Sequence, residues 1–223
     1  IGNETACIGF ANNAHEGICI NFRDDRTHRY TLREEEILRD RIQRLFYNPL
    51  NKFIAQNGSF DCGWLWYKDR IHVPQVWFDT LLAHHTLYPR MPHNLGYLTA
   101  QYTDHPYYKD DGKTWREGGN INQFWDYNIK DCCITWAAHK AIHKELRTQK
   151  LDDFYFSHVQ RLQPHLVRMQ VGGILADTSL KDKIATELKE ELDAKLRTFH
   201  RIVTDLTGDP DFRPNPKSPK QLG

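Results

Sequence analysis

A periodic pattern of apolar residues marks the middle of the chain. Apolar side chains recur there at helical spacing, at Ile134, Ala138, Ala141 and Ile142. We therefore predict an amphipathic helix from about residue 124 to about residue 147. Tyr127 and Asp131 lie four residues apart on this helix, so their side chains share a face. A phenol beside a carboxylate suits metal-assisted hydrolysis, but a packed tyrosine and a solvated aspartate give the same spacing.

The first part of the chain alternates strands with a helix. Residues 5–11 and 17–22 carry strand patterns on either side of an Asn-rich turn, and we predict that they pair antiparallel. Thr31 and Glu34 match a capping box, which opens a helix through about residue 46. Five apolar side chains of this helix are expected to point inward: Ile37, Leu38, Ile42, Leu45 and Phe46.

A polar region separates this part from the central helix. Asp79 stands just before an apolar run and predicts the N-cap of a helix, with a substrate contact or an outer metal ligand as the alternative role. Residues 94–102 predict another short helix. Residues 103–120 predict an ordered loop beside a cleft, in which Lys109 and Lys113 either touch phosphates or are solvated.

The sequence after Gln149 changes to a helical pattern. Residues 151–172 predict one helix, and the glycine pair Gly172-Gly173 stops it. Thr178 or Ser179 can cap a second helix that runs to about residue 206. Its apolar stripe has near-heptad spacing, which predicts an antiparallel helix pair: Ile184, Leu188, Leu192, Leu196, Phe199 and Val203.

Composition excludes several classes of protein. The 223 residues allow one or two domains, and the net charge of +1 provides no global basic field for nucleic acid. Five cysteines without a CxxC motif favour a reducing cytoplasm over a disulfide framework. We find neither an apolar run of transmembrane length nor a signal peptide, so a membrane partner is not expected.

A second motif gives the central helix a specific meaning. Residues 52–55 predict a short buried strand, and Asn57, Phe60 and Asp61 follow at its carboxyl end, where ligands collect in open sheets. About seventy residues later comes the Tyr-x-x-x-Asp pattern of the central helix. This order resembles the second and third motifs of the DEDD 3′→5′ exonucleases. Because the third motif has a tyrosine, the sequence resembles the proofreading domain of family A DNA polymerases. The flanking segments resemble those of the phage-type members.

The resemblance extends over nearly the whole chain. Matching segments flank the motifs, at residues 79–85, 95–98 and 108–113, and continue at residues 165–177 and 212–222. It implies an α/β, RNase H-like exonuclease domain in residues 1–150, with a mixed sheet and flanking helices. It also implies that residues 151–223 are the helical start of the polymerase (thumb) domain. The implied setting is DNA replication in the cytoplasm of a bacterium or a phage-infected host cell.

The resemblance also implies a mechanism and roles for five residues. Asp61 and Asp131 would be metal ligands that converge in space, Tyr127 would orient the attacking water, and two Mg²⁺ or Mn²⁺ ions would assist hydrolysis. Asn57 and Phe60 would line the site of the 3′-terminal nucleotide, with packing as the alternative role for Phe60. The implied partners are a single-stranded DNA 3′ end, the dNMP product and the remainder of the polymerase chain.

Two of the four acids of this family are not found in the sequence. The Asp-x-Glu motif belongs just before the first predicted strand, and Glu4 is the nearest acid. We interpret Glu4 as a solvated turn residue and expect the motif to precede Ile1, which would make the chain a fragment with its first strand missing. With two acids for two cations, we expect weak metal binding and little activity until an Asp-x-Glu strand is restored.

Other functions remain open at this point. An RNA-trimming nuclease similar to RNase D uses the same chemistry, and a degenerate domain could serve as a scaffold that binds single strands. His139 and His143 have the spacing of a zinc pair, but the sequence shows no third or fourth ligand at a sensible distance.

Overall fold

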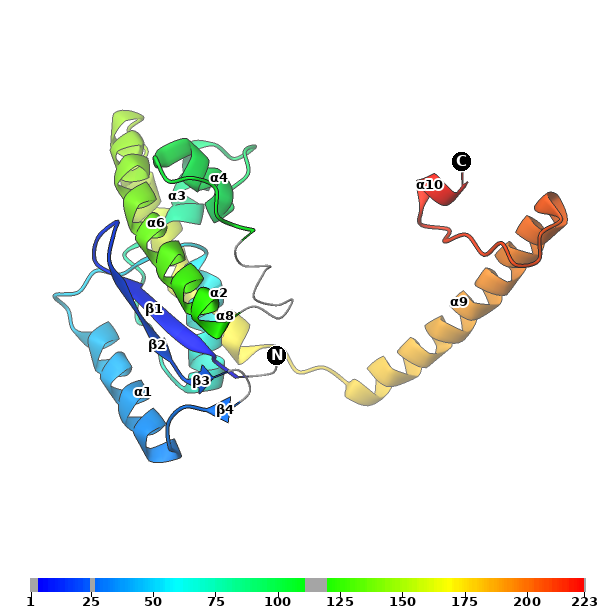
Figure 1. Cartoon of the computed structure of the whole chain (residues 1–223), viewed down its shortest axis with the longest axis horizontal. Coiled ribbons are helices and arrows are strands. Elements are labelled where there is room, and N and C mark those ends of the chain that lie inside the picture. The colour runs from blue at the N-terminus through cyan, green and yellow to red at the C-terminus, as the bar shows by residue number, and fades with distance from the viewer. Residues whose placement is uncertain (1–3, 25–26, 111–119, 223) are drawn as a thin grey trace. The chain divides into compact units, whose positions relative to one another are not determined.

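The computed structural model describes residues 4–24, 27–110 and 120–222, and it combines strands with helices as predicted (Figure 1). The chain divides into two compact units, Ile1–Gly173 and Ile174–Gly223. In the described ranges, no helix is long and apolar enough to cross a membrane. All five candidate site residues belong to the first unit.

The strands of the described residues form three two-stranded ladders: β1 (Cys7–Ala11) with β2 (Gly17–Asn21), β3 (Arg23–Asp24) with β4 (Thr27–His28), and β5 (Ile54–Ala55) with β6 (Phe78–Asp79). The first two ladders are antiparallel and the third is parallel. The predicted hairpin is therefore confirmed. Both strand directions of the expected mixed sheet are present, but the described strands stay in separate two-stranded ladders.

The helices of the first unit are α1 (Leu32–Tyr47), α2 (Gly58–Trp64), α3 (Thr80–Leu87), α4 (Leu95–Tyr102), α6 (Ile121–Thr148), α7 (Asp152–Phe154) and α8 (Gln160–Gly172). Two π-helical turns, η1 (Leu65–Asp69) and η3 (Tyr155–Val159), continue α2 and α7. The second unit contains α9 (Thr178–Thr207) and α10 (Pro219–Leu222). The predicted central helix is confirmed as α6, which begins at Ile121.

Helix α1 confirms its predicted cap and corrects its predicted inner face. The Thr31 N–H donates to Glu34 Oε2 at 2.8 Å, and the Glu34 N–H donates to Thr31 Oγ1 in return. The apolar side chains of the inner face form one row, Leu38, Ile42 and Phe46, and the charged Glu35 is also buried on this helix. Ile37 and Leu45 were expected inside but are 51% and 41% exposed. Each precedes a row member by one position, and one residue turns a helix by about 100°.

Two other helix starts differ in how well the sequence predicted them. The Asp79 carboxylate accepts the Leu81 N–H at 2.9 Å, which confirms Asp79 as the N-cap of α3. Helix α9 is capped by Asp177, which accepts the Leu180 N–H at 2.9 Å. The prediction of a Thr178 or Ser179 cap is therefore wrong. An aspartate adds a negative charge at the positive end of the helix dipole, which a hydroxyl does not.

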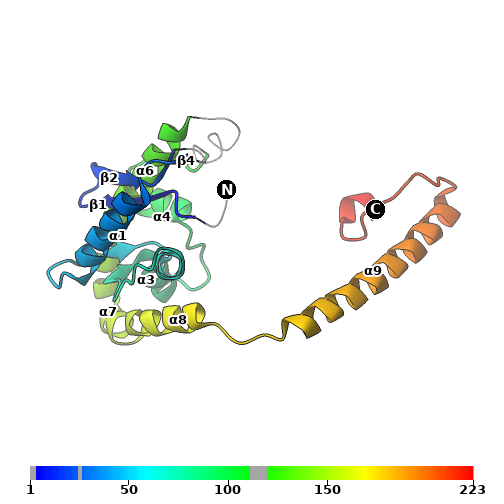
Figure 2. The same cartoon turned by 90° about the horizontal axis from the view of Figure 1, so that it is seen from below.

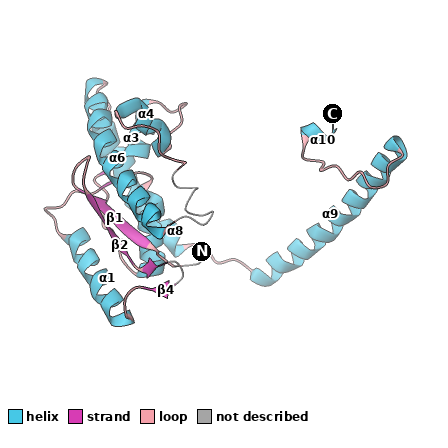
Figure 3. Ribbon diagram, viewed as in Figure 1, coloured by secondary structure: helices cyan, strands magenta, loops and turns pink. Residues whose placement is uncertain are grey.

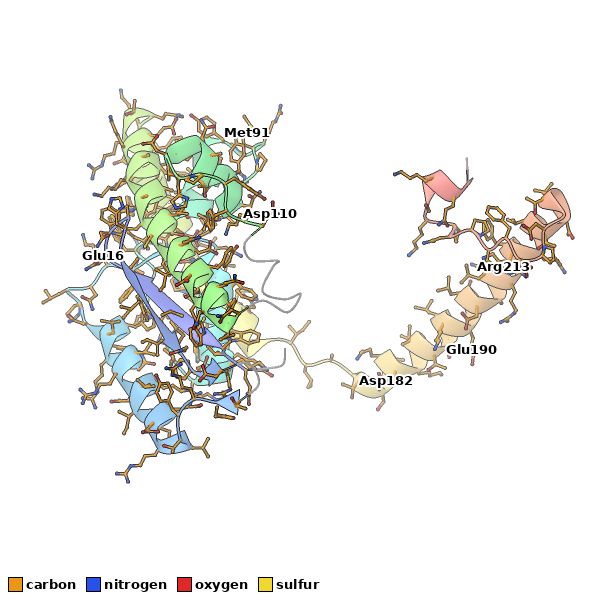
Figure 4. The ribbon with its side chains drawn as sticks, viewed as in Figure 1. Glu16, Met91, Asp110, Asp182, Glu190 and Arg213 are labelled. Atoms are coloured by element: carbon orange, nitrogen blue, oxygen red, sulfur yellow. The ribbon has the colours of Figure 1, made fainter. Side chains whose placement is uncertain are left out.

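The β1–β2 hairpin lies between helices α6 and α1 (Figures 1 and 3). Successive strand side chains point to opposite faces. Gly9 faces α6 so closely that an added Cβ would lie 2.0 Å from Asn128 Oδ1 and 2.9 Å from Cys132 Sγ. Phe10 faces the other way, with its ring 6.0 Å from that of Phe46 on α1. The turn at the tip of the hairpin carries Glu16, which points away from the unit (Figure 4).

Two large apolar clusters and a small one of Leu95, Tyr108 and Ile134 form the described core of the first unit. One large cluster lies under α1 and α2 and contains Phe22, Ile42, Cys62, Leu65, Ile71, Val73, Val76 and Val167. The other large cluster lies against the second half of α6 and contains Phe78, Ala83, Leu87, Leu98, Ala138, Ile142, Leu146 and Tyr155. Helix α6 thus connects the hairpin with α3 and α4.

The first compact unit continues past residue 150. Tyr155 is completely buried in the second apolar cluster, and Val167 is buried in the first. Helix α8 packs against α2 (Figure 1), and Figure 2 shows α8 following α7 along the edge of the unit. Residues 151–173 therefore fold with the exonuclease-like part, beyond the boundary expected near residue 150. Within the described residues after that boundary, every element is helical, as expected. The antiparallel pairing with α9 stays a prediction.

Candidate functional site

The Asn57–Asp61 segment is shaped by its backbone. After β5 the chain turns at Asn57, whose φ of 60° is left-handed, and α2 begins at Gly58. The buried Asp79 carboxylate accepts the N–H groups of Asn57 at 3.1 Å and Gly58 at 2.7 Å. A Cβ on Gly58 would lie 2.8 Å from Ala55 Cβ, so only glycine fits this approach. Asp61 is thereby placed in the first turn of α2, with the Asn57 side chain exposed.

Asp61 carries a carboxyl group with unusual electrostatics. The residue reaches solvent, but the surrounding protein desolvates its carboxyl and the nearby negative charge of Asp79 adds to the effect. Together they raise the pKa of Asp61 to about 6. In the described residues no cation pairs with Asp61 to offset this penalty. A bound cation would stabilise the ionised carboxylate, so the donor chemistry at Asp61 fits a hard metal ion.

Asp131 is held by side chains instead. Lys109 Nζ donates to Asp131 Oδ1 at 2.7 Å and to the Tyr127 hydroxyl at 3.0 Å. One ammonium group therefore touches both residues of the predicted helix face, and this confirms that Tyr127 and Asp131 point the same way. The Tyr108 hydroxyl also donates to Asp131 Oδ1, at 2.5 Å. Burial, followed by the charge of Asp131, raises the pKa of Tyr108, so its hydroxyl stays protonated.

The thiol of Cys132 is affected by the charges of both acidic residues. Burial is the first cause that raises its pKa to about 12, and the charges of Asp131 and Asp61 both contribute. The convergence of the two carboxylates on a common metal stays a prediction. Among the described residues, no group of three or more His, Cys, Asp or Glu side chains is arranged to hold a metal.

Phe60 lies on the surface beside Asp61. Its side chain is 61% exposed, and its ring stacks on Trp64 with a centroid distance of 6.3 Å and an interplanar angle of 22°. Trp64 is fixed in turn because its indole N–H donates to Thr5 Oγ1 at 2.8 Å. An exposed aromatic ring of this kind is available to a nucleobase. It is not used in the core.

The other candidates of the sequence lie elsewhere. Glu4 pairs with Arg23 Nε at 3.1 Å and is largely exposed, as expected of a solvated residue. The rings of His139 and His143 contact Trp77 and Phe78. Lys113 and most of the predicted loop lie outside the described residues.

Sequence reasoning missed two supports of the site. Lys109 was expected to touch phosphate or to be solvated, and Tyr108 was noted only within the matching segment 108–113, because no spacing relates them to a helix that begins later in the chain. Asp79 was predicted as a cap, but its bonds to Asn57 and Gly58 join segments 21 and 22 residues apart. The only signal available was an acid directly after a strand, and that signal is common.

A comparison of the sequence with models of known protein families gives a match for most of the chain. The sequence model of a family described as 3′-5′ exonuclease matches residues 4–147. The matched range includes Asn57, Asp61, Tyr127 and Asp131, so the resemblance found in the sequence is confirmed. The match also implies an RNase H-like α/β fold for this range. No curated protein matches the chain.

Proposed function

Because the chain belongs to this family of 3′-5′ exonucleases, we propose that it hydrolyses the 3′-terminal nucleotides of single-stranded DNA as the proofreading part of a family A DNA polymerase. The proposal is supported by the family match, which contains both motifs, and by the position of Tyr127 and Asp131 on one face of α6, where Lys109 binds both. The products would be dNMPs. Residues 151–223 would lead into the polymerase domain, and replication in the cytoplasm of a bacterium or phage-infected host is the proposed setting.

Asp61 and Asp131 are the residues that would hold divalent cations, Mg²⁺ or Mn²⁺. Both offer hard carboxylate oxygens, and the desolvated Asp61 gains most from a positive partner. When bound, such cations activate a water and stabilise the leaving oxygen in phosphodiester hydrolysis. Lys109 already neutralises Asp131, so a metal ion and the Lys109 ammonium compete for the same carboxylate.

Tyr127 is proposed to orient the attacking water through its hydroxyl. That hydroxyl accepts from Lys109 Nζ, which leaves its own proton free to point toward a water. The Lys109 ammonium also lies over the Tyr127 ring, 5.0 Å from its centroid, and this contact limits the positions that the ring can take. Lys109 therefore fixes the phenol and the carboxylate relative to each other.

Asn57 and Phe60 are proposed to bind the terminal nucleotide. Both side chains are exposed at the start of α2, next to Asp61. The Asn57 amide can donate to and accept from a nucleotide, and the Phe60 ring offers a stacking surface. Stacking on aromatic rings contributes about 1–3 kcal/mol per base and tolerates any base, which suits an enzyme that removes whichever nucleotide stands last.

The direct test is digestion of 5′-labelled single strands in the presence of Mg²⁺ or Mn²⁺. We expect DNA fragments that shorten slowly and stepwise from the 3′ end, in keeping with the little activity expected of two acids, and no shortening with a chelator. Asp131→Asn should remove the activity, whereas Asp126→Asn, an exposed acid on the same helix, should keep it. Degradation of the matching RNA strand alone would support an RNase D-like enzyme instead. Strand binding without cleavage at any metal concentration would support a scaffold.

A further inference from the structure

A buried polar network joins the candidate site to the helix that follows the matched range. Its centre is the Asp79 carboxylate, which is 1% exposed. Oδ1 accepts the N–H of Asn57 and that of Leu81, and Oδ2 accepts the N–H of Gly58. A further donor comes from α8, because Gln163 Nε2 donates to Oδ2 at 2.9 Å.

Gln163 is itself held in place by neighbours from the same segment. Gln160 Nε2 donates to Gln163 Oε1 and to the Val76 carbonyl, both at 2.7 Å. The Tyr155 hydroxyl donates to Gln160 Oε1 at 2.6 Å and accepts the Asp79 N–H at 2.8 Å. The chain of bonds therefore leaves Asp79 through its backbone and returns to its carboxylate.

Breaking this network should cost stability, because its side chains are buried away from solvent. Tyr155, Gln160 and Gln163 are 0%, 1% and 3% exposed. An acceptor or donor that loses its partner at such a depth cannot be compensated by water. The π-helical turn η3 belongs to the same arrangement, since it carries Tyr155 at its start and delivers Gln160 directly after its end. Turns of this type often occur where a side chain must be placed for function.

Gln163 reaches the site loop itself as well as Asp79. Its Nε2 atom lies 3.3 Å from the position that a Cβ on Gly58 would occupy. The amide thus packs against the backbone of the turn that leads from Asn57 to Asp61. The Asp79 carboxylate has two oxygens, and the one that binds Gly58 is the one that Gln163 also binds.

We propose that Gln163, backed by Gln160 and Tyr155, is a positioning residue for the Asn57–Asp61 segment. Through it, the first helical segment after residue 150 sets the geometry of the candidate exonuclease site. The inference rests on the proposed function for its catalytic meaning, but the positioning itself is a property of the folded chain. Residues beyond the family match, which ends at residue 147, are then part of the working site.

The experiment compares Gln163→Met with Gln170→Met in the full chain. Methionine keeps the length of glutamine and removes its hydrogen bonds. Gln170 lies on the same helix and faces α2 at Gly63, without a bond to Asp79, so it is a matched control. Amide hydrogen exchange at Asn57 and Gly58 should accelerate about tenfold in Gln163→Met, because one bond of a buried carboxylate is lost. Exchange in Gln170→Met should equal that of the unchanged chain.

Enzyme kinetics provide the functional arm of this test. With single-stranded DNA, Gln163→Met should lower kcat about tenfold, since supports outside a metal site typically contribute 10–100-fold. Gln170→Met should not lower it. Unchanged exchange at Asn57 and Gly58 in Gln163→Met would overturn the positioning role. If Gln163→Met does not fold, Gln163→Asn, which keeps the amide but shortens the side chain, should show the same accelerated exchange, and normal exchange in it would overturn the inference.

Failure of the two claims can be told apart. Accelerated exchange at Asn57 and Gly58 supports the positioning role whether or not the chain cleaves DNA. Absence of both Mn²⁺ binding and cleavage in the unchanged chain would overturn the proposed function alone.

Discussion

Asp61 stands in the first turn of the short helix α2, whose start is fixed through backbone bonds, whereas Asp131 stands on a long helix and is fixed by side chains. On the first side, Asp79 ties down the N–H groups before Asp61 and leaves the Asp61 carboxyl without a cation among the described residues. On the second side, Lys109 and Tyr108 bind the Asp131 carboxylate directly. The backbone before one acid is thus held but its carboxyl is not neutralised, and the other acid is neutralised by a lysine side chain.

This difference suggests separate roles in metal binding. A rigid, desolvated carboxylate attracts a cation without further rearrangement. A carboxylate that already pairs with lysine must exchange one positive partner for another. We therefore expect Asp61 to bind a cation without losing another partner, and Asp131 to bind it only at the cost of its pair with Lys109.

The largest effect is expected on stability, when the Asp79 carboxylate that holds the backbone before Asp61 is removed. Asp79→Ala removes the acceptor of several N–H groups in a buried position, and it should lower the free energy of unfolding by about 3 kcal/mol. Urea unfolding checks the value. An exposed acid on α9, Asp182, gives the matched control, Asp182→Ala, which should change stability little (Figure 4). Equal stability of both variants would show that the Asp79 network does not hold the loop.

A smaller effect is expected at Tyr127, beside Asp131, and it should concern the rate of cleavage alone. Tyr127→Phe removes the hydroxyl that is proposed to orient water, and it should slow cleavage about 100-fold, at the low end of what positioned proton-transfer groups contribute. The affinity for Mn²⁺ should not change, because the phenol is not a proposed metal ligand. Single-turnover cleavage and calorimetric titration with Mn²⁺ measure the two quantities. A loss of Mn²⁺ binding in this variant would place the phenol on the cation instead.

The Lys109 pair provides the next test. Lys109→Met keeps most of the side chain and removes the charge that competes for Asp131, so Mn²⁺ should bind about tenfold more tightly, a gain of about 1.4 kcal/mol. Lys140→Met, on the exposed side of α6, is the control and should bind like the unchanged chain. Weaker Mn²⁺ binding in Lys109→Met would mean that the lysine assists the metal site and does not compete with it.

The smallest effect is a pH dependence of local stability, which should differ between the segment before Asp61 and the helix that carries Asp131. Burial, followed by the charge of His93, lowers the pKa of His84, while Glu145 opposes this and His85 adds to it. A lowered pKa in the folded state means that this contribution to stability is present above the ordinary pKa and is lost as the pH falls through the lowered one. Protonation would also disturb the bond of 2.7 Å between the Nδ1 atoms of His84 and His93.

The Asn57–Asp61 segment should respond to this protonation at a higher pH than α6 does. The His93 carbonyl accepts from Gln56 Nε2 at 2.7 Å, directly before Asn57. Between pH 7.5 and pH 5.5, amide exchange corrected for intrinsic pH effects should therefore accelerate at Asn57 and less at Asp131. His84→Gln should reduce the difference. Equal acceleration at both positions would show that the two sides are not supported independently.

The sequence predicted those parts of the molecule that depend on local chemistry. Helix α6 follows from apolar spacing, the α1 cap from the Thr31–Glu34 pair, and the α3 cap from Asp79. The candidate residues Asp61 and Asp131 followed from a motif resemblance, and the family match contains both. The exposure of Ile37 could not be predicted, because helical spacing does not fix the width of the covered face.

Contacts between distant segments were beyond the sequence. The bond of Gln163 to Asp79 spans 84 residues, and that of Lys109 to Asp131 spans 22. A buried glutamine carries no pattern that distinguishes it from a solvated one. The inclusion of residues 151–173 in the first unit was not predicted either. Their helical sequence pattern suggested a separate part of the chain.

A crystal structure of the protein soaked with Mn²⁺, with the metal located by its anomalous scattering, tests the central claim most directly. The account predicts a Mn²⁺ ion bonded to carboxylate oxygens of both Asp61 and Asp131, with Lys109 Nζ displaced from Asp131 Oδ1. A Mn²⁺ ion bound to neither residue, or to one of them with the Lys109–Asp131 pair intact, would contradict it.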